Sequence, residues 1–224
     1  GYVLLASDYA QIELRILAHF AMDAKLCAAF DSSSDIFAGI AAQWTGTPVD
    51  GISKDDRNRM KQICYALLYG AGPAKVAADA GCSIPEAEGL MRGFMTCYPG
   101  IKTFMNQVKN SCRSKGYVET LLGRRRHLRG ISSANRKDRA RAERQAVNTV
   151  CQGSAADLIK LAMINIQHRL VEEFGSRGYH GHCSYPGGAL YARMDCVRLV
   201  LQVHDELVFE VEEEHLHEVA CVVK

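Results

Sequence analysis

Charged residues lie where a predicted sheet turns over. In the stretch LVLQVHDELVFEV (199–211), apolar residues alternate on both sides of His204, Asp205 and Glu206, which predicts two half-buried strands joined by a short turn. Near the N-terminus, YVLLASD predicts another strand, which ends at Asp8. Charged groups lose hydration at such positions, so we expect a ligand or partner to compensate them.

Asp8 and Asp205 form the first candidate site. Two strand-end carboxylates converge when their strands are neighbours in one sheet, and they repel each other unless cations neutralise them. Oxygen-rich sites of this kind suit Mg²⁺, and two such ions can promote an in-line phosphoryl displacement. Strand-end aspartates are also common turn formers, so the pair alone leaves both interpretations open.

A predicted helix at about 54–70 carries the second candidate site. Residues four apart share one face of a helix, and here that face offers cations for phosphates and flat rings for a sugar and base, as a nucleoside triphosphate requires. An amphipathic helix with snorkelling cations and packed tyrosines would explain the same pattern. The stripe consists of Arg57, Lys61, Tyr65 and Tyr69.

A longer predicted helix, at about 135–170, repeats this spacing with Arg144, Asn148 and Gln152. A row of donors and acceptors can follow a nucleic-acid backbone or the minor-groove edges of base pairs, although a solvated helix face is a common alternative. The segment 113–144 holds eleven Lys and Arg residues against three acids. Such an excess indicates nucleic-acid binding or an ordinary solvated surface.

The bulk composition limits the class of protein. The 224 residues are 48% apolar with a net charge of +2, enough for one large core or two modest ones. No apolar run approaches the roughly 20 residues of a membrane span, and the N-terminus does not resemble a signal peptide, so we expect no membrane contact. Because the chain starts at Gly1 and a strand begins at once, we expect it to be a fragment.

The nine cysteines include no CxxC pair and their number is odd, which favours free thiols in a reducing intracellular compartment over disulfides or a zinc cage. The local exception is a possible metal cluster of His180, His182 and Cys183, for which a solvated loop is the preferred interpretation because no fourth ligand is obvious.

Strands at both ends with a helical block between them predict an α+β fold, in which a helical subdomain interrupts one sheet. A hairpin is expected in YVETLLGRRRHL, and the glycine-rich stretch around 175–188 is expected to be an exposed insertion. Predicted helices lie at about 12–20, 35–44, 54–70 and 135–170. Two more begin with SIPEAE and with YPGIK, the second of which ends at Gly116.

Five segments in this order resemble those of the family A DNA polymerases. SDYAQIELRILAHF resembles motif A, RNRMKQICYALLYGAG resembles motif B, and LQVHDELVFE resembles motif C, while TLLGRRR and AERQAVNTVCQGSAADLIK are similar to the connecting segments. The resemblance covers essentially the whole chain. It implies template-directed DNA synthesis from dNTPs on primer-template DNA, in an incomplete right-hand fold.

The resemblance also implies roles for individual residues. Asp8 and Asp205 would bind two catalytic Mg²⁺ ions, with the Tyr9 carbonyl as a further ligand and Glu206 as a supporting acid. Lys61 would contact the phosphates and protonate the leaving group. The nucleotide-binding set would be Gln11, Glu13, Arg57, Lys61, Tyr65 and Tyr69, with Glu13 excluding a ribose 2′-hydroxyl; the DNA-binding set would be Arg144, Asn148, Gln152 and His204.

The implied subdomains are a palm at 1–20 with motif A, fingers at 21–120 with the motif B helix, and further palm at 121–224 with the motif C hairpin. An insertion at about 175–197 and the KQICY segment are similar to theta-type eukaryotic members, with nu-type members second and bacterial or organellar DNA polymerase I third. A theta-type protein would act in DNA repair or translesion synthesis in the nucleus. A non-catalytic nucleic-acid binder and a two-metal nuclease are the alternatives.

Three side chains of the nucleotide region depart from bacterial members of the family. Tyr65 stands where many have Phe, and its hydroxyl is expected to ease incorporation of dideoxynucleotides. Phe37 stands where a phosphate-binding His is usual, so we expect that interaction with phosphate to be absent. Gln62 stands where a small residue is usual, and we expect it to face the closing base pair and to reduce fidelity.

Overall fold

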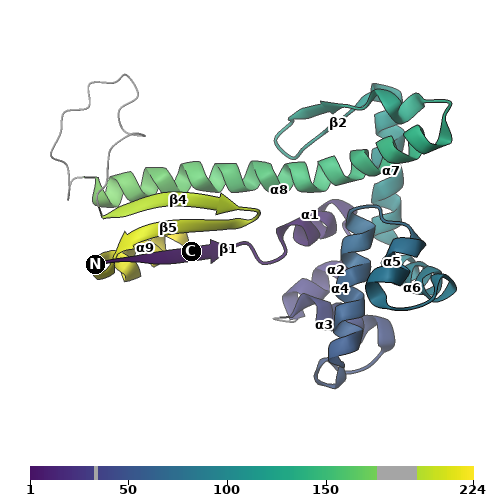
Figure 1. Ribbon diagram of the computed structural model, residues 1–224, viewed down its shortest axis with the longest axis horizontal. Helices are drawn as coiled ribbons and strands as arrows, with labels where there is room; N and C mark the ends of the chain where they lie inside the picture. The colour runs from purple at the N-terminus through teal and green to yellow at the C-terminus, as the bar shows by residue number, and fades with distance from the viewer. Residues whose placement is uncertain (33–34, 176–195) are drawn as a thin grey trace. The chain divides into compact units, whose positions relative to one another are not determined.

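The computed structural model describes residues 1–32, 35–175 and 196–224 (Figure 1). The chain divides into two compact units, here called the sheet unit (1–12 and 155–224) and the helical unit (13–154). The proposed cluster of His180, His182 and Cys183 and most of the expected insertion lie outside the described residues. Within the described residues, no helix is long and apolar enough to cross a membrane, and the cysteines are free thiols.

An antiparallel sheet of three strands organises the sheet unit. The strand order is β1 (Tyr2–Asp8), β5 (Glu206–Glu212) and β4 (Val197–Val203), with β5 in the centre. The alternation read from the sequence is present in β5, where every second residue is buried. Both predicted strands are present, and the N-terminal strand β1 pairs with β5. Only β5 is half-buried, however, because Leu201 and Val203 of β4, which were expected on the buried face, are exposed.

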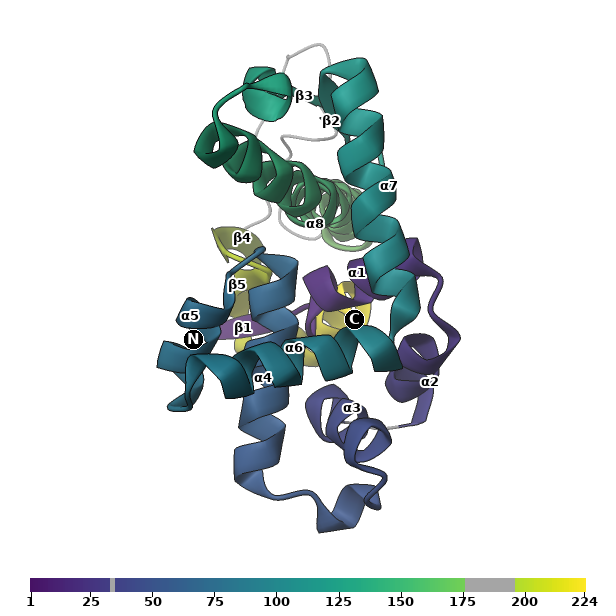
Figure 2. The ribbon, with the colours of Figure 1, turned by 90° about the vertical axis from the view of Figure 1, so that its right-hand side faces the viewer.

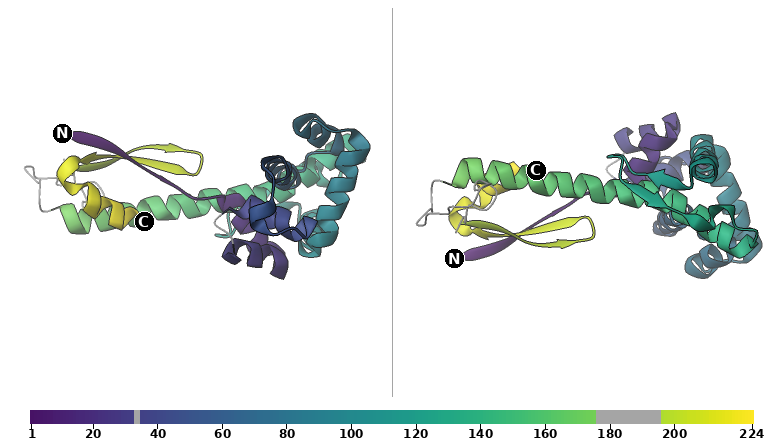
Figure 3. Two further views of the ribbon diagram at one scale, coloured as in Figure 1. Left: turned by 90° about the horizontal axis from the view of Figure 1, so that it is seen from below. Right: turned by 90° about the horizontal axis from the view of Figure 1, so that it is seen from above.

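Helices complete this unit. The helix α9 (Leu216–Val223) contacts β1 and β5, and α8 (Arg136–Phe174) runs along the sheet with its C-terminal part (Figures 1 and 3). A 3₁₀ turn, η3 (Glu213–His215), joins β5 to α9. Apolar side chains of α8, β5 and α9 are buried between them, namely Ile159, Leu170, Phe174, Leu207, Phe209, Val211 and Val219.

In the described part of the helical unit, seven helices are followed by a hairpin and the first part of α8. The helix α4 (Lys54–Leu68) packs beside α3 (Ile36–Thr45), α5 (Pro73–Ala80) and α6 (Ile84–Cys97) (Figure 2). Two 3₁₀ turns, η1 (Val49–Gly51) and η2 (Arg129–Ser132), connect elements. The remaining helices and strands of this unit are α1 (Ile12–Ala21), α2 (Ala24–Ser32), α7 (Pro99–Lys115), β2 (Tyr117–Glu119) and β3 (Arg125–His127).

Local sequence signals explain where these helices begin. Ser53 caps α4 by accepting a hydrogen bond from the Asp56 N–H at 3.0 Å, and Ser83 and Glu86 form a reciprocal capping box at the start of α6. Pro73, which follows Gly72, occupies the first turn of α5, where a missing N–H costs nothing. The helices predicted from the sequence do not include α5, although a proline after a glycine is compatible with a helix start.

Candidate active site

Three carboxylates meet at one end of the sheet. The register of β1 and β5 places Asp8 directly opposite Glu206, and the Tyr9 N–H donates a hydrogen bond to the Asp205 carbonyl oxygen at 3.2 Å. Because β1 lies beside β5, two aspartates nearly two hundred residues apart in the chain become neighbours. The convergence of Asp8 with Asp205 expected from the sequence is therefore present.

The charges of this cluster act on one another. The pKa of Asp8 is raised above its usual range, first by partial burial and then by the negative charges of Asp205 and Glu206. Like charges this close destabilise one another, and a divalent cation with oxygen ligands would relieve that repulsion. The residues present thus fit a divalent metal site.

Backbone strain lies on both sides of this cluster. Gln11 and His204 have φ angles of 52° and 55°, in the left-handed region that non-glycine residues rarely adopt. The Gln202 side chain steadies the turn by donating to the His204 carbonyl oxygen at 3.1 Å. Each such residue costs of order 1 kcal/mol, and strain of this kind collects at functional sites.

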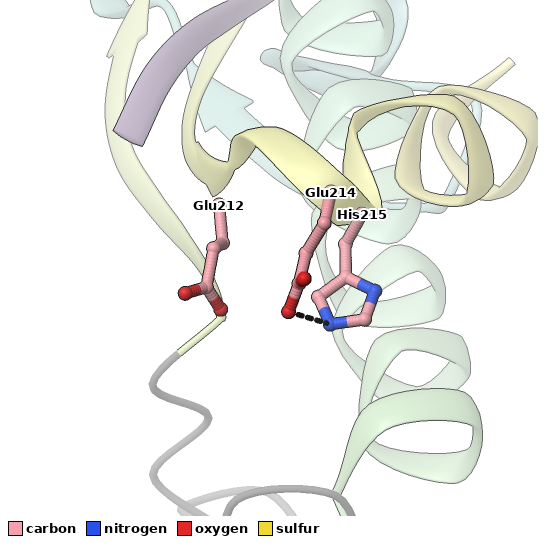
Figure 4. Close-up of side chains that lie close together, drawn as sticks. All are labelled: Glu212, Glu214 and His215. Atoms are coloured by element: carbon pink, nitrogen blue, oxygen red, sulfur yellow. Dashed lines mark ion pairs between the residues drawn. The ribbon is translucent and has the colours of Figure 1, made fainter. Parts of the chain in front are cut away.

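A second acidic group lies at the other end of β5, six residues from Glu206, or roughly 20 Å along a strand. The carboxylates of Glu212 and Glu214 and the His215 ring bring their ligand atoms within 4.8 Å of one another (Figure 4). The ring also packs edge-on against Phe174 at 5.5 Å. Exposed acidic groups commonly gather without an ion, so this group is distinct from the candidate active site and provides no evidence for a metal.

The stripe on α4 forms as predicted, and the structure adds partners to it. The rings of Tyr65 and Tyr69 stack with centroids 6.0 Å apart and planes 11° apart. Phe37 is buried. The centre of its ring lies 5.9 Å from the centre of the Tyr65 ring, and the Arg57 guanidinium carbon lies 5.7 Å from the centre of the Phe37 ring. Phe37 therefore supports the aromatic face of the stripe from within the core.

The two cations of this stripe differ in their surroundings. Arg57 donates a short hydrogen bond from Nε to the Asp35 carboxylate, whereas Lys61 is exposed and pairs with no carboxylate among the described residues. Burial would raise the pKa of Asp35, but hydrogen bonds from Arg57 and from the N–H groups of Ala38 and Phe37 hold it below its usual range. Part of the Arg57 charge is thus already compensated.

Tyr69, at the end of α4, joins the two polar stripes of the sequence. Its hydroxyl donates to Glu13 Oε2 at 2.8 Å, the Gln152 side chain hydrogen bonds to it, and Asn148 Nδ2 donates to its carbonyl oxygen at 3.4 Å. Burial and the neighbouring Glu13 carboxylate both raise the pKa of this hydroxyl well above its usual range. Five proposed site residues therefore gather here, since Arg144 packs against the adjacent Gly70.

Some functional contacts could not be read from the sequence. Asp35 looked only like a helix start, yet it also binds Arg57. Gln62 donates from Nε2 to the Asp79 carbonyl oxygen of α5 at 2.7 Å, so its amide is already bonded within the helical unit. Its expected contact with a closing base pair stays a prediction.

An acidic sheet end suits divalent ions, and a helix with cations and stacked aromatic rings suits a nucleoside triphosphate; a nucleic-acid polymerase requires both. The chain belongs to DNA polymerase family A, whose family model matches residues 1–224. It is 40% identical to DNA polymerase theta of Mus musculus over 237 aligned residues, covering all of this chain and 9% of that protein. It is 39% identical to DNA polymerase I of Rhizobium leguminosarum, covering all of this chain and 20% of that protein.

A solved structure gives the same assignment. The POL domain of Pol1 from M. smegmatis, in complex with DNA primer-template and dNTP, matches with a TM-score of 0.84 and 36% identity, over 100% of this chain and 36% of that one. The fold class and the family expected from the sequence are confirmed. The chain spans a tenth to a fifth of the length of the curated relatives above, and polymerases of this family use divalent metal ions.

Proposed function

We propose that the protein is a DNA-directed DNA polymerase, which transfers a nucleotidyl group from a dNTP to the 3′-hydroxyl of a primer with two Mg²⁺ ions. The convergence of Asp8 with Asp205 and Glu206 at the sheet end is the observation that carries the proposal. The solved relative in complex with primer-template and dNTP supports it.

In this proposal Asp8, Asp205 and the Tyr9 carbonyl hold the metal ions, and Glu206 supports them by adding negative charge. When bound, the ions lower the pKa of the primer 3′-hydroxyl and neutralise the triphosphate. The pairing of β1 with β5 holds Asp8 opposite Glu206, and the Tyr9 N–H holds the backbone of Asp205, so these ligands are arranged before substrate binds.

The helical unit would bind the incoming nucleotide. The exposed Lys61 ammonium contacts the phosphates and donates a proton to the leaving pyrophosphate, while Arg57 adds positive charge. The Tyr69 hydroxyl holds the Glu13 carboxylate in place. A fixed position is required if the Glu13 side chain is to exclude a ribose 2′-hydroxyl. The stacked rings of Tyr65 and Tyr69 offer a flat surface for the sugar and base.

Further roles complete the proposal. Gln11 takes part in nucleotide binding, and Arg144, Asn148, Gln152 and His204 contact primer-template DNA. We assign residues 1–20 and 121–224 to a palm and residues 21–120 to fingers.

A theta-type role in DNA repair or translesion synthesis in the nucleus is the finer proposal. The identity of 40% to two theta enzymes supports it, but the 39% identity to DNA polymerase I leaves a bacterial-type enzyme as the alternative. Extension from a mismatched primer end, or past an abasic template site, distinguishes a theta-type enzyme from a bacterial-type one, because a theta-type enzyme would tolerate mismatched ends and damaged templates.

Primer extension by the full-length protein, with dNTPs and Mg²⁺, tests the activity. Elongation that disappears in Asp205→Asn supports the polymerase. Degradation of the primer would identify a two-metal nuclease, and DNA binding without either reaction would identify a non-catalytic binder.

A further inference from the structure

A polar pocket of about 450 Å³ opens in the helical unit between the end of β3, the turn η2 and the first turns of α8. None of the sites discussed so far includes it. Three arginines contribute to its lining together with two further polar side chains and one acid: Arg126, Arg129, Arg141, His127, Gln145 and Asp138.

The charge of the pocket is positive because nearby acids are engaged elsewhere. Of the three acids in the basic segment 113–144, Glu119 pairs with Arg125 at 2.8 Å and Glu143 pairs with Arg113 at 2.5 Å. Asp138 is the third and lies in the pocket itself. Three guanidinium groups therefore face one carboxylate, and a surplus of two positive charges is left for an anion.

The individual arginines suit an anionic ligand. Arg126 is held in place by a hydrogen bond from Nη1 to Thr149 Oγ1 at 2.9 Å, and Thr149 is buried. Arg129 and Arg141 are exposed, and neither has a carboxylate at ion-pair distance in the part of the chain that the structure describes. A planar guanidinium binds phosphate oxygens through two parallel hydrogen bonds. The pocket therefore combines one guanidinium held in place, that of Arg126, with two that can adjust to a ligand, those of Arg129 and Arg141.

The position of Arg141 on α8 connects the pocket with the proposed DNA-binding stripe of Arg144, Asn148 and Gln152. Arg141 precedes Asn148 by seven residues, which returns to the same helix face within about 20°. The two lie about 10 Å apart along the helix axis, on the order of three base-pair steps of 3.4 Å. A strand bound along the stripe can therefore reach the pocket.

We infer that this pocket binds a backbone phosphate of the DNA duplex, about three base-pair steps from the nucleotides that Asn148 contacts. The inference rests on the proposed function, since it takes DNA as the ligand. Exposed arginines bind a lone anion weakly because water and salt screen them. In contrast, a polyanion that is already held by neighbouring side chains gains affinity from each further phosphate that is bound, through release of counterions.

The test compares Arg129→Ala/Arg141→Ala with a control that loses the same charge, Arg92→Ala/Arg169→Ala, in the full-length protein. The two control arginines are exposed and form ion pairs within their helices with Glu88 and Glu173. Primer-template affinity is measured by fluorescence anisotropy over a range of salt concentrations. The pocket variant is expected to bind several-fold more weakly at low salt. Its salt slope, the slope of the logarithm of the binding constant against the logarithm of the salt concentration, is expected to be less steep by about 0.9 for each phosphate that it no longer binds.

A primer-template with single neutral methylphosphonate linkages locates the bound phosphate. The wild-type protein is expected to lose affinity at one or two neighbouring linkages, and the pocket variant is expected to lose none there. Equal affinity and equal salt slope in the pocket and control variants would overturn the inference. So would binding of inorganic phosphate or pyrophosphate that the pocket variant abolishes while DNA binding stays unchanged.

The outcome is separable from that of the proposed function. The extension rate at saturating DNA is expected to be the same in the pocket variant and the wild type, because the pocket arginines take no part in chemistry. If the wild-type protein binds DNA through the pocket but extends no primer, the proposed polymerase activity fails and the pocket stands.

Discussion

Substitution of Gly70 by alanine tests the junction of α4 and α8. Gly70 follows Tyr69 and has a φ angle of 64°. A Cβ atom there would lie 2.7 Å from Arg144 Cγ, 3.0 Å from Cδ and 3.2 Å from Cβ. The outer atoms can rotate away, but the Cβ of Arg144 is fixed by the backbone of α8, so α4 and α8 must separate slightly.

The expected cost has two parts. An alanine in the left-handed region costs about 1–2 kcal/mol, and overpacking against Arg144 adds about 1–3 kcal/mol. Gly81→Ala is the matched control, because Gly81 has a φ angle of 63° and nothing within 4 Å of the added Cβ. It is therefore expected to show the first part alone.

Hydrogen exchange in the full-length protein measures these local free energies, at the amides that end α4 for Gly70→Ala and at those that end α5 for Gly81→Ala. Primer-template affinity, measured in parallel, is expected to fall in Gly70→Ala because Arg144 is displaced. In an Arg144→Ala background, Gly70→Ala is expected to cost no more than Gly81→Ala. A penalty in Gly70→Ala that equals the control, or that persists unchanged without the Arg144 side chain, would refute the reasoning.

Three further substitutions probe the nucleotide region. Tyr65→Phe is expected to lower the use of dideoxynucleotides relative to dNTPs, since the hydroxyl can replace a hydrogen bond lost with the 3′-hydroxyl; an unchanged selectivity ratio speaks against this. Asp35→Asn keeps a capping side chain but loses the ion pair with Arg57. Because the interaction with Arg57 lowers the pKa of Asp35, the variant protein is expected to be less stable than the wild type by up to about 1 kcal/mol at pH 7. That difference is expected to vanish as the pH falls through and below about 4, where the carboxylate is protonated; thermal unfolding at both pH values checks it. Gln62→Ala removes the hydrogen bond to the Asp79 carbonyl and is expected to cost about 1 kcal/mol, visible as faster hydrogen exchange in α5, whereas unchanged exchange means that the bond is not formed in solution.

Regular patterns allowed the sequence to predict much of the fold. The alternation in LVLQVHDELVFEV predicted β4 and β5, and the helix predicted at about 54–70 corresponds to α4. Short helices were missed. Both α2 and α5 have at most nine residues, too few turns for a clear periodicity, and they depend on packing within the helical unit.

The site was predictable in its residue types but not in its contacts. Strand-end position was enough to nominate Asp8 and Asp205, because strand pairing then determines where they meet. The meeting of Tyr69 with Asn148 and Gln152 depends on how α4 packs against α8, and no spacing in the chain encodes that packing. The same holds for the bond between Asp35 and Arg57, which joins two helices.

The carboxylate cluster carries the central claim, that Asp8 and Asp205 form a metal site for nucleotidyl transfer. The most direct measurement combines primer extension and thermal unfolding of Asp205→Asn and the wild type, with and without Mg²⁺. Binding of the ion to the folded state alone raises the midpoint of unfolding. The account predicts that Mg²⁺ stabilises only the wild type, and that Asp205→Asn extends no primer although it is no less stable than the wild type without Mg²⁺. Extension by Asp205→Asn at the wild-type rate, or equal stabilisation of both proteins by Mg²⁺, would contradict it.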